Sequence, residues 1–139
     1  MPHALAIEVA NIKDLLIIRG QNHYPHDVEM TVAASHPALR QGGSAAFSIE
    51  TAEGEVLAVV QEIERGFFNH DMAELEVAIR AAVSKGHQLA IARVALVRPG
   101  AVPKTSSGKI RRLDCRRMLL DGELPLINRN AEDLVSVAD

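Results

Sequence analysis

Cysteine, net positive charge and long apolar runs are all scarce in this sequence. Its one cysteine, Cys115, excludes an intrachain disulfide and any metal site built from several cysteines. Fifteen Lys and Arg against 18 Asp and Glu give a formal net charge of −3, so no global basic field favours nucleic-acid binding. No apolar run approaches the roughly 20 residues that a membrane-spanning helix needs, and residues 1–10 lack the basic start and long apolar stretch of a signal peptide. We therefore expect a cytoplasmic protein with no membrane span.

The chain is long enough for one domain with a real core. It has 139 residues, of which 47% are hydrophobic and 24% charged, as in ordinary globular proteins. Six histidines raise the question of a metal site, but His23 and His26 lack a carboxylate-rich partner motif and the other four are scattered. We expect no metal site.

Apolar and turn-forming residues alternate along the chain in a pattern that predicts an α+β domain. We expect a short N-terminal strand pair, a central and mainly antiparallel three-stranded sheet, and flanking helices. Pro25 should begin the first helix, and Asp71 should cap a second helix that stops at Gly86. His36 to Gly43 should be a loop, and the run from Glu55 to Glu64 should be the central strand, after a tight hairpin turn. Further strands are expected at 44–50 and 89–97, and a last helix at 113–120.

A loop rich in lysine, serine and glycine follows the last predicted strand. It reads Pro103-Lys-Thr-Ser-Ser-Gly-Lys109-Ile-Arg-Arg112 and can bring backbone N–H groups and positive charge to an anion. It is not a Walker phosphate loop, because the nearest earlier glycine is Gly100 and Ile110 follows the lysine where Ser or Thr is needed. From the residues alone, a solvated basic turn is the alternative.

This motif closely resembles the last core motif of adenylate-forming enzymes, the superfamily of acyl-CoA synthetases, fatty acyl-AMP ligases, peptide-synthetase adenylation domains and luciferases. The resemblance implies that Lys109 is catalytic and contacts the acyl carboxylate and adenylate oxygens. It also implies that Thr105, Ser106 and Gly108 shape the substrate and nucleotide loop.

A second stretch, Lys13-Asp14-Leu-Leu-Ile-Ile followed by Arg19-Gly-Gln-Asn-His-Tyr-Pro25, resembles the superfamily's hinge motif in the form typical of fatty acyl-AMP ligases. The resemblance implies that Lys13 is the hinge about which the domain rotates between two half-reactions. After that rotation the residues that face the adenylate and the phosphopantetheine channel would be Arg19, Gly20, Gln21 and Asn22.

Together the resemblances divide the chain into a lead-in at 1–11, the C-terminal domain of an adenylate-forming ligase at 12–124, and a tail or linker at 125–139. They imply that ATP and Mg²⁺ are bound mainly by an N-terminal adenylation domain of the same enzyme, that the substrate is a fatty acid, and that the isolated chain is inactive. The acyl acceptor would be the phosphopantetheine of an acyl carrier protein, in polyketide or lipid biosynthesis, or coenzyme A if the parent is an acyl-CoA synthetase. Acidic carrier proteins could meet the basic side chains of Arg111, Arg112, Arg116 and Arg117, which could equally form a solvated helix face. A non-catalytic module that binds a carrier protein is a further alternative.

Overall fold

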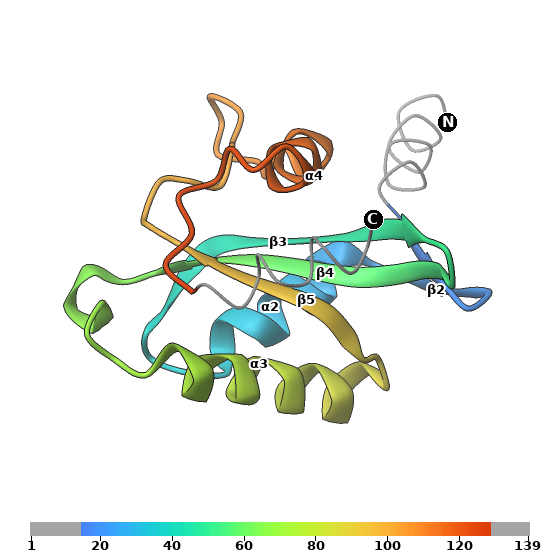
Figure 1. Ribbon diagram of the computed structural model, residues 1–139, viewed down its shortest axis with the longest axis horizontal. Helices are drawn as coiled ribbons and strands as arrows, with labels where there is room; N and C mark the ends of the chain where they lie inside the picture. The colour runs from blue at the N-terminus through green and yellow to red at the C-terminus, as the bar shows by residue number, and fades with distance from the viewer. Residues whose placement is uncertain (1–14, 129–139) are drawn as a thin grey trace.

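The computed structural model describes residues 15–128, so Lys13, the lead-in at 1–11 and the end of the predicted tail lie outside the described residues. Two antiparallel strands form a small sheet, and three longer strands form the main one (Figure 1). The elements in chain order are β1 (Leu16–Ile18), β2 (Gln21–His23), α2 (Pro25–Ala34), β3 (Leu39–Thr51), β4 (Gly54–Ile63), the 3₁₀ turn η1 (Arg65–Phe67), α3 (Met72–His87), β5 (Ile91–Val97) and α4 (Arg112–Leu120).

The main sheet has the order β3-β4-β5, which confirms the α+β class and the central position of β4. A tight turn pairs Thr51 with Gly54, so β3 and β4 run antiparallel, as expected. β5 instead runs parallel to β4, and the sheet is therefore mixed rather than purely antiparallel. The reason is α3, which carries the chain back along the sheet before β5 begins.

Each face of the main sheet packs against its own helices. α2 and α3 cover one face and α4 lies over the other (Figure 1). In β4 the alternate residues Leu57 and Val59 belong to the α2/α3 core, while Ala58 and Val60 belong to the α4 core. A strand buried on both faces needs apolar residues at consecutive positions, which explains the unbroken apolar run in β4.

The helix starts are as expected, but one helix end is not. Pro25 occupies the start of α2, and the Asp71 side chain accepts a hydrogen bond of 3.0 Å from the Ala73 N–H at the start of α3. The predicted stop at Gly86 is wrong, because α3 continues to His87 and Gln88 is its C-cap. Gln88 takes the left-handed conformation (φ 54°) usually given to glycine, and its N–H bonds to the Ser84 carbonyl at 3.0 Å.

The predicted loop from His36 to Gly43 is also partly wrong, because β3 begins at Leu39. The pairing of β3 with β4 shifts between Leu39 and Ser44, so the polar and glycine-rich residues between them form an irregularity within the strand. A polar run containing two glycines looks like a loop in sequence, and only its pairing with β4 shows otherwise.

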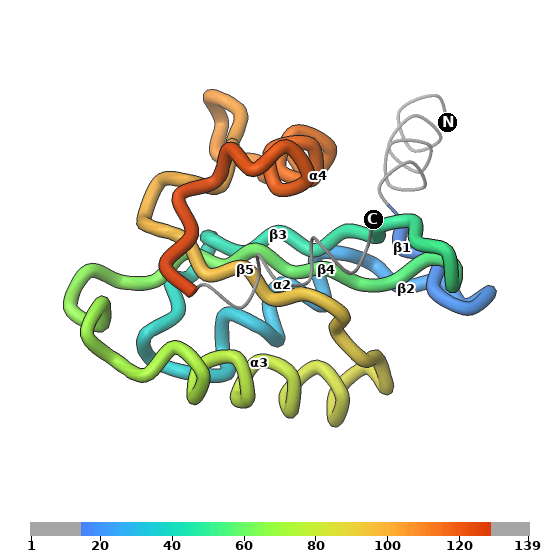
Figure 2. The backbone as a smooth tube through the Cα atoms, viewed as in Figure 1, coloured from blue at the N-terminus to red at the C-terminus, as the bar shows by residue number. Residues whose placement is uncertain are grey.

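The folded chain continues past the boundary expected at Leu124. Leu126 bridges Val97, and the Ile127 N–H bonds to the Leu96 carbonyl at 2.7 Å. Asn128, within the tail or linker expected at 125–139, is 3% exposed, and both its amide oxygen and its amide nitrogen are hydrogen-bonded. The tube in Figure 2 shows this last described segment returning across the end of β5. Within residues 15–128, no helix combines the length and the apolar character required to cross a membrane.

Candidate functional site

The lysine loop is a tight turn that closes on itself between Pro103 and Arg111. The Arg111 N–H bonds to the Pro103 carbonyl at 2.9 Å, and Lys104 bridges Ile110. Thr105 then holds the tip, because its N–H donates to the Lys109 carbonyl at 2.8 Å and its Oγ1 accepts from the Lys109 N–H at 3.0 Å. Thr105 is therefore both a hydrogen-bond donor to the Lys109 backbone and an acceptor from it.

Gly108 and two hydroxyls complete the tip. Gly108 has φ 90°, a conformation that L side chains rarely adopt, and its N–H bonds to the Thr105 carbonyl at 2.9 Å. The Thr105 hydroxyl lies 3.1 Å from the Ser107 hydroxyl. Ser107, which was not among the predicted site residues, thus contacts Thr105, and both residues are exposed, as is Ser106 between them.

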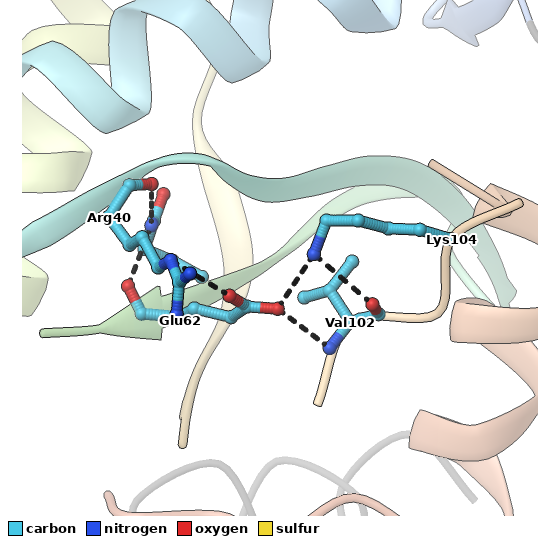
Figure 3. A network of polar contacts seen from close by, with 5 residues as sticks. Arg40, Glu62, Val102 and Lys104 are labelled. Atoms are coloured by element: carbon cyan, nitrogen blue, oxygen red, sulfur yellow. Dashed lines mark hydrogen bonds and ion pairs between the residues drawn. The ribbon is translucent and has the colours of Figure 1, made fainter. Parts of the chain in front are cut away.

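Lys109 is exposed at the tip, and within residues 15–128 its ammonium group has no ion pair or hydrogen bond. A long, mobile stem with a compact charge suits a group that must reach an anion on another body. The other lysine of the loop, Lys104, differs: its Nζ donates to Glu62 Oε2 at 3.0 Å and lies 3.4 Å from the Val102 carbonyl (Figure 3).

The two ends of the loop are held by two buried carboxylates that sequence reasoning missed. At the entry, Glu62 of β4 accepts from the Val102 N–H at 3.0 Å. At the exit, Glu29 of α2 forms a bidentate ion pair with Arg112, whose Nε and Nη2 each lie 2.7 Å from a carboxylate oxygen. Glu29 also accepts from the Ala46 N–H of β3 at 2.9 Å, so α2, β3 and the start of α4 meet at this carboxylate.

A cavity of about 740 Å³ opens beside the loop tip. It is bounded by the lysine loop, α2 and the start of β3, and its lining residues are His26, Glu29, Met30, Ala33, Gln41, Gly42, Ser44, Gly108, Lys109, Ile110 and Arg112. Both Glu29 oxygens are already engaged by Arg112 and the Ala46 N–H. The charge of Glu29 is thus largely balanced by Arg112, and the exposed Lys109 ammonium in the lining makes this cavity suited to an anion.

The predicted transfer face lies on the β1–β2 hairpin. Arg19 and Gly20 form its turn with φ 53° and 79°, and Gln21 and Asn22 follow in β2 with their side chains exposed. The hairpin is at one end of the molecule, away from the lysine loop, which extends beyond the α4 face of the main sheet (Figure 1). The structure thus does not bring these residues together with Lys109.

The basic residues of α4 and its N-terminal flank are largely paired within the domain. Arg111 contacts Asp114 at 2.6 Å, and Arg117 lies 3.5 Å from Asp121 and 3.3 Å from Glu123. With Arg112 bound to Glu29, this face presents less unpaired positive charge than the sequence suggests.

One histidine cluster has the spacing of a metal site, but its His36 ring is already engaged in a hydrogen bond. Within residues 15–128, His36, His70 and Glu74 place ligand-type atoms within 4.8 Å of one another. The His36 Nδ1 accepts the Ala38 N–H at 3.0 Å, so neutral His36 carries its proton on Nε2, the atom 3.9 Å from Glu74. Binding a metal through Nε2 would require the proton to move to Nδ1 and the hydrogen bond with Ala38 to be lost. The absence of a metal site stays a prediction.

Comparison with known proteins places the chain in a family. The family described as "Disco-interacting protein 2-like, AMP domain" matches residues 13–129. The medium-chain-fatty-acid–[acyl-carrier-protein] ligase JamA of Moorena producens is 49% identical over 114 residues, which cover 81% of this chain and 19% of JamA. The long-chain-fatty-acid–AMP ligase FadD32 of Mycobacterium marinum is 38% identical over 133 residues, covering 81% and 21%. The chain thus spans about a fifth of the curated relatives it matches.

Solved structures agree with this placement. The fatty acid AMP ligase from Legionella pneumophila superposes with a TM-score of 0.66 at 35% identity, covering 81% of this chain and 20% of that one. The adenylation and carrier-protein structure of McyG with phenylalanyl-adenylate, at 23% identity, shares the fold with a TM-score of 0.73, covering 88% and 19%. The chain therefore belongs to the adenylate-forming ligases, as a domain of the Disco-interacting protein 2-like AMP family.

Proposed function

We propose that this chain is the C-terminal domain of a fatty acyl-AMP ligase and that Lys109 is its catalytic residue. The observation that carries the proposal is the loop tip, where the turn held by Thr105 presents an exposed ammonium that no residue in 15–128 pairs with, beside a cavity. The relatives named as fatty acid ligases, JamA and FadD32, support the substrate class.

The chemistry requires a positive charge of this kind. A fatty acid carboxylate oxygen attacks the α-phosphorus of ATP, a P–O bond forms, and the bond to pyrophosphate breaks to leave an acyl-adenylate. Negative charge is spread over the carboxylate, the α-phosphate and the leaving group. The ammonium of Lys109 would orient the carboxylate and stabilise this charge. The chain covers only a fifth of its relatives, so we assign ATP and Mg²⁺ to the remainder of the enzyme.

For the second half-reaction we propose rotation about Lys13, which withdraws Lys109 and brings the hairpin of Arg19, Gly20, Gln21 and Asn22 to the adenylate. The distance between hairpin and lysine loop supports the idea that one face serves each step (Figure 1). The thiol of a carrier-protein phosphopantetheine then attacks the acyl carbonyl, and AMP leaves.

An acyl-CoA synthetase is the second possibility, because the putative fatty-acid–CoA ligase FadD21 of Mycobacterium leprae is 41% identical over 112 residues. The full-length parent distinguishes the two by whether carrier protein or coenzyme A receives the acyl group. A module that only binds carrier protein would need no lysine at the loop tip.

The test of Lys109 is ATP–pyrophosphate exchange by the full-length parent with a panel of fatty acids. We expect Lys109→Ala to lower exchange by about 10²–10³-fold, the scale of one preorganised transition-state contact. Lys85→Ala, which removes an exposed lysine near the end of α3, is the control and should exchange normally. Equal exchange by wild type and Lys109→Ala would exclude the catalytic assignment and leave transfer or docking as the domain's role.

A further inference from the structure

Glu62 is a buried carboxylate aimed at the entry of the lysine loop. Its side chain is 1% exposed, and its Oε2 accepts from both the Val102 N–H and the Lys104 ammonium at 3.0 Å (Figure 3). Its Oε1 lies 3.9 Å from the Arg40 guanidinium. The carboxylate thus joins the central strand of the sheet to the two residues that flank Pro103.

Fold stability alone does not call for a carboxylate at this position. Glu62 lies near the end of β4 among residues buried on both faces, where an apolar side chain avoids the desolvation of a charge. The chain also makes room for it: a Cβ at Gly43, in the irregular part of β3, would lie 2.9 Å from both the Cβ and Oε1 of Glu62. A glycine, a strand irregularity and a buried charge therefore combine at one place.

A continuous path of contacts leads from Glu62 to Lys109. Glu62 holds Lys104, Lys104 bridges Ile110 across the neck of the loop, and the next pair inward is Thr105 with Lys109. Beyond the neck, the hydrogen bonds of the tip within residues 15–128 are made inside the loop itself. The position of the tip relative to the sheet is thus set at its two ends.

We propose that Glu62 is a positioning residue for Lys109 and that Lys104 is its anchoring partner rather than a second catalytic lysine. The inference rests on the proposed role of Lys109 in adenylation. Glu62 holds the base of the loop against β4, so that the Lys109 ammonium at the tip keeps a fixed position relative to the sheet. A displacement of about 1 Å at a reacting group can cost about 10²-fold in rate.

The test measures both half-reactions in the full-length parent. We expect Glu62→Ala to lower the kcat of ATP–pyrophosphate exchange by about 10–100-fold, with KM for ATP and fatty acid within about threefold of wild type. Acyl transfer from supplied acyl-adenylate to the acceptor should stay unchanged, because Lys109 takes no part in that step. Glu62→Gln keeps an acceptor for the Val102 N–H and should retain most of the rate, while Lys104→Met should resemble Glu62→Ala. Glu64→Ala, an exposed glutamate two residues further on, is the matched control.

A double variant separates positioning from general stability. If Glu62 acts through Lys109, Glu62→Ala should cost little once Lys109→Ala is present, because the misplaced group is already gone. Full additivity of the two losses, or an equal loss in both half-reactions, would overturn the inference, as would wild-type exchange by Glu62→Ala. Because Lys109→Ala is measured alongside, a failure of the proposed function is recognised separately: exchange would then survive the loss of Lys109 itself.

Discussion

The ion pair between Glu29 of α2 and Arg112 of α4 joins two residues that are 83 positions apart in sequence. Replacing only one of the two should lower the free energy of unfolding considerably. In Arg112→Met the Glu29 carboxylate, whose side chain is 7% exposed, keeps the Ala46 N–H at 2.9 Å but loses both guanidinium contacts at 2.7 Å. Leaving one member of a buried pair unpaired costs about 3–5 kcal/mol. For a chain of this length about 4 °C of Tm is lost per kcal/mol, so we expect Tm to fall by about 12–20 °C.

Urea and thermal unfolding of the chain measure this directly, and the neighbouring residue supplies a matched control. Arg111 pairs with Asp114 at 2.6 Å on the surface, with 56% of its side chain exposed. Arg111→Met should therefore cost less than about 1 kcal/mol. The double variant Glu29→Leu/Arg112→Met should recover much of the lost stability, because no charge is then left unpaired. A loss in Arg112→Met no larger than that in Arg111→Met would refute the reasoning.

Two further predictions concern buried polar groups. Burial, followed by the nearby Glu29 and Glu62 carboxylates, raises the pKa of the Cys115 thiol from 9.0 to about 12. We expect the Cys115 thiol of the folded chain to resist alkylation by iodoacetamide at pH 8, and rapid labelling at that pH would contradict this. We also expect the free energy of unfolding to decrease as pH rises from 9 towards 12, because the thiol of the unfolded chain ionises at a lower pH than that of the folded chain. Asn128→Ala removes the acceptor of the Leu96 N–H (2.7 Å) and the donor to the Val94 carbonyl (2.8 Å). Urea unfolding should therefore show a free energy of unfolding lower by about 2–3 kcal/mol. The control Asn69→Ala, at an exposed position, should lower it by less than about 0.5 kcal/mol. Equal stability of these two variants would show that the buried hydrogen bonds of the Asn128 amide do not stabilise the fold.

Local sequence patterns were reliable wherever the physical cause lay within a few residues. The hairpin turn that ends at Gly54, the start of α2 at Pro25 and the cap of α3 at Asp71 follow from backbone angles and hydrogen bonds between neighbours in sequence. The end of α3 was wrong because Gly86 lies within the helix and Gln88 takes the left-handed conformation instead. Because a non-glycine residue rarely takes that conformation, the sequence near Gln88 does not indicate that the helix ends there.

The lysine loop also combines local features that the sequence predicts with long-range contacts that it does not. Its residues and the exposed position of Lys109 follow from a short motif whose hydrogen bonds are local, from Thr105 to Lys109. The two carboxylates that hold it are 40 or more residues away from their partners on the loop, at Glu62 to Val102 and at Glu29 to Arg112. In sequence both glutamates look like ordinary charged residues.

By itself, then, the sequence determined the order of the main strands and helices, the α+β class and the loop with its lysine, because these depend on spacing, turn chemistry and short-range hydrogen bonds. Tertiary structure alone decided that β5 runs parallel to β4, that Asn128 belongs to the core, and that Glu29 and Glu62 anchor the loop. Those features arise from contacts between distant segments, and the low solvent exposure that makes such polar contacts strong exists only after the chain has packed.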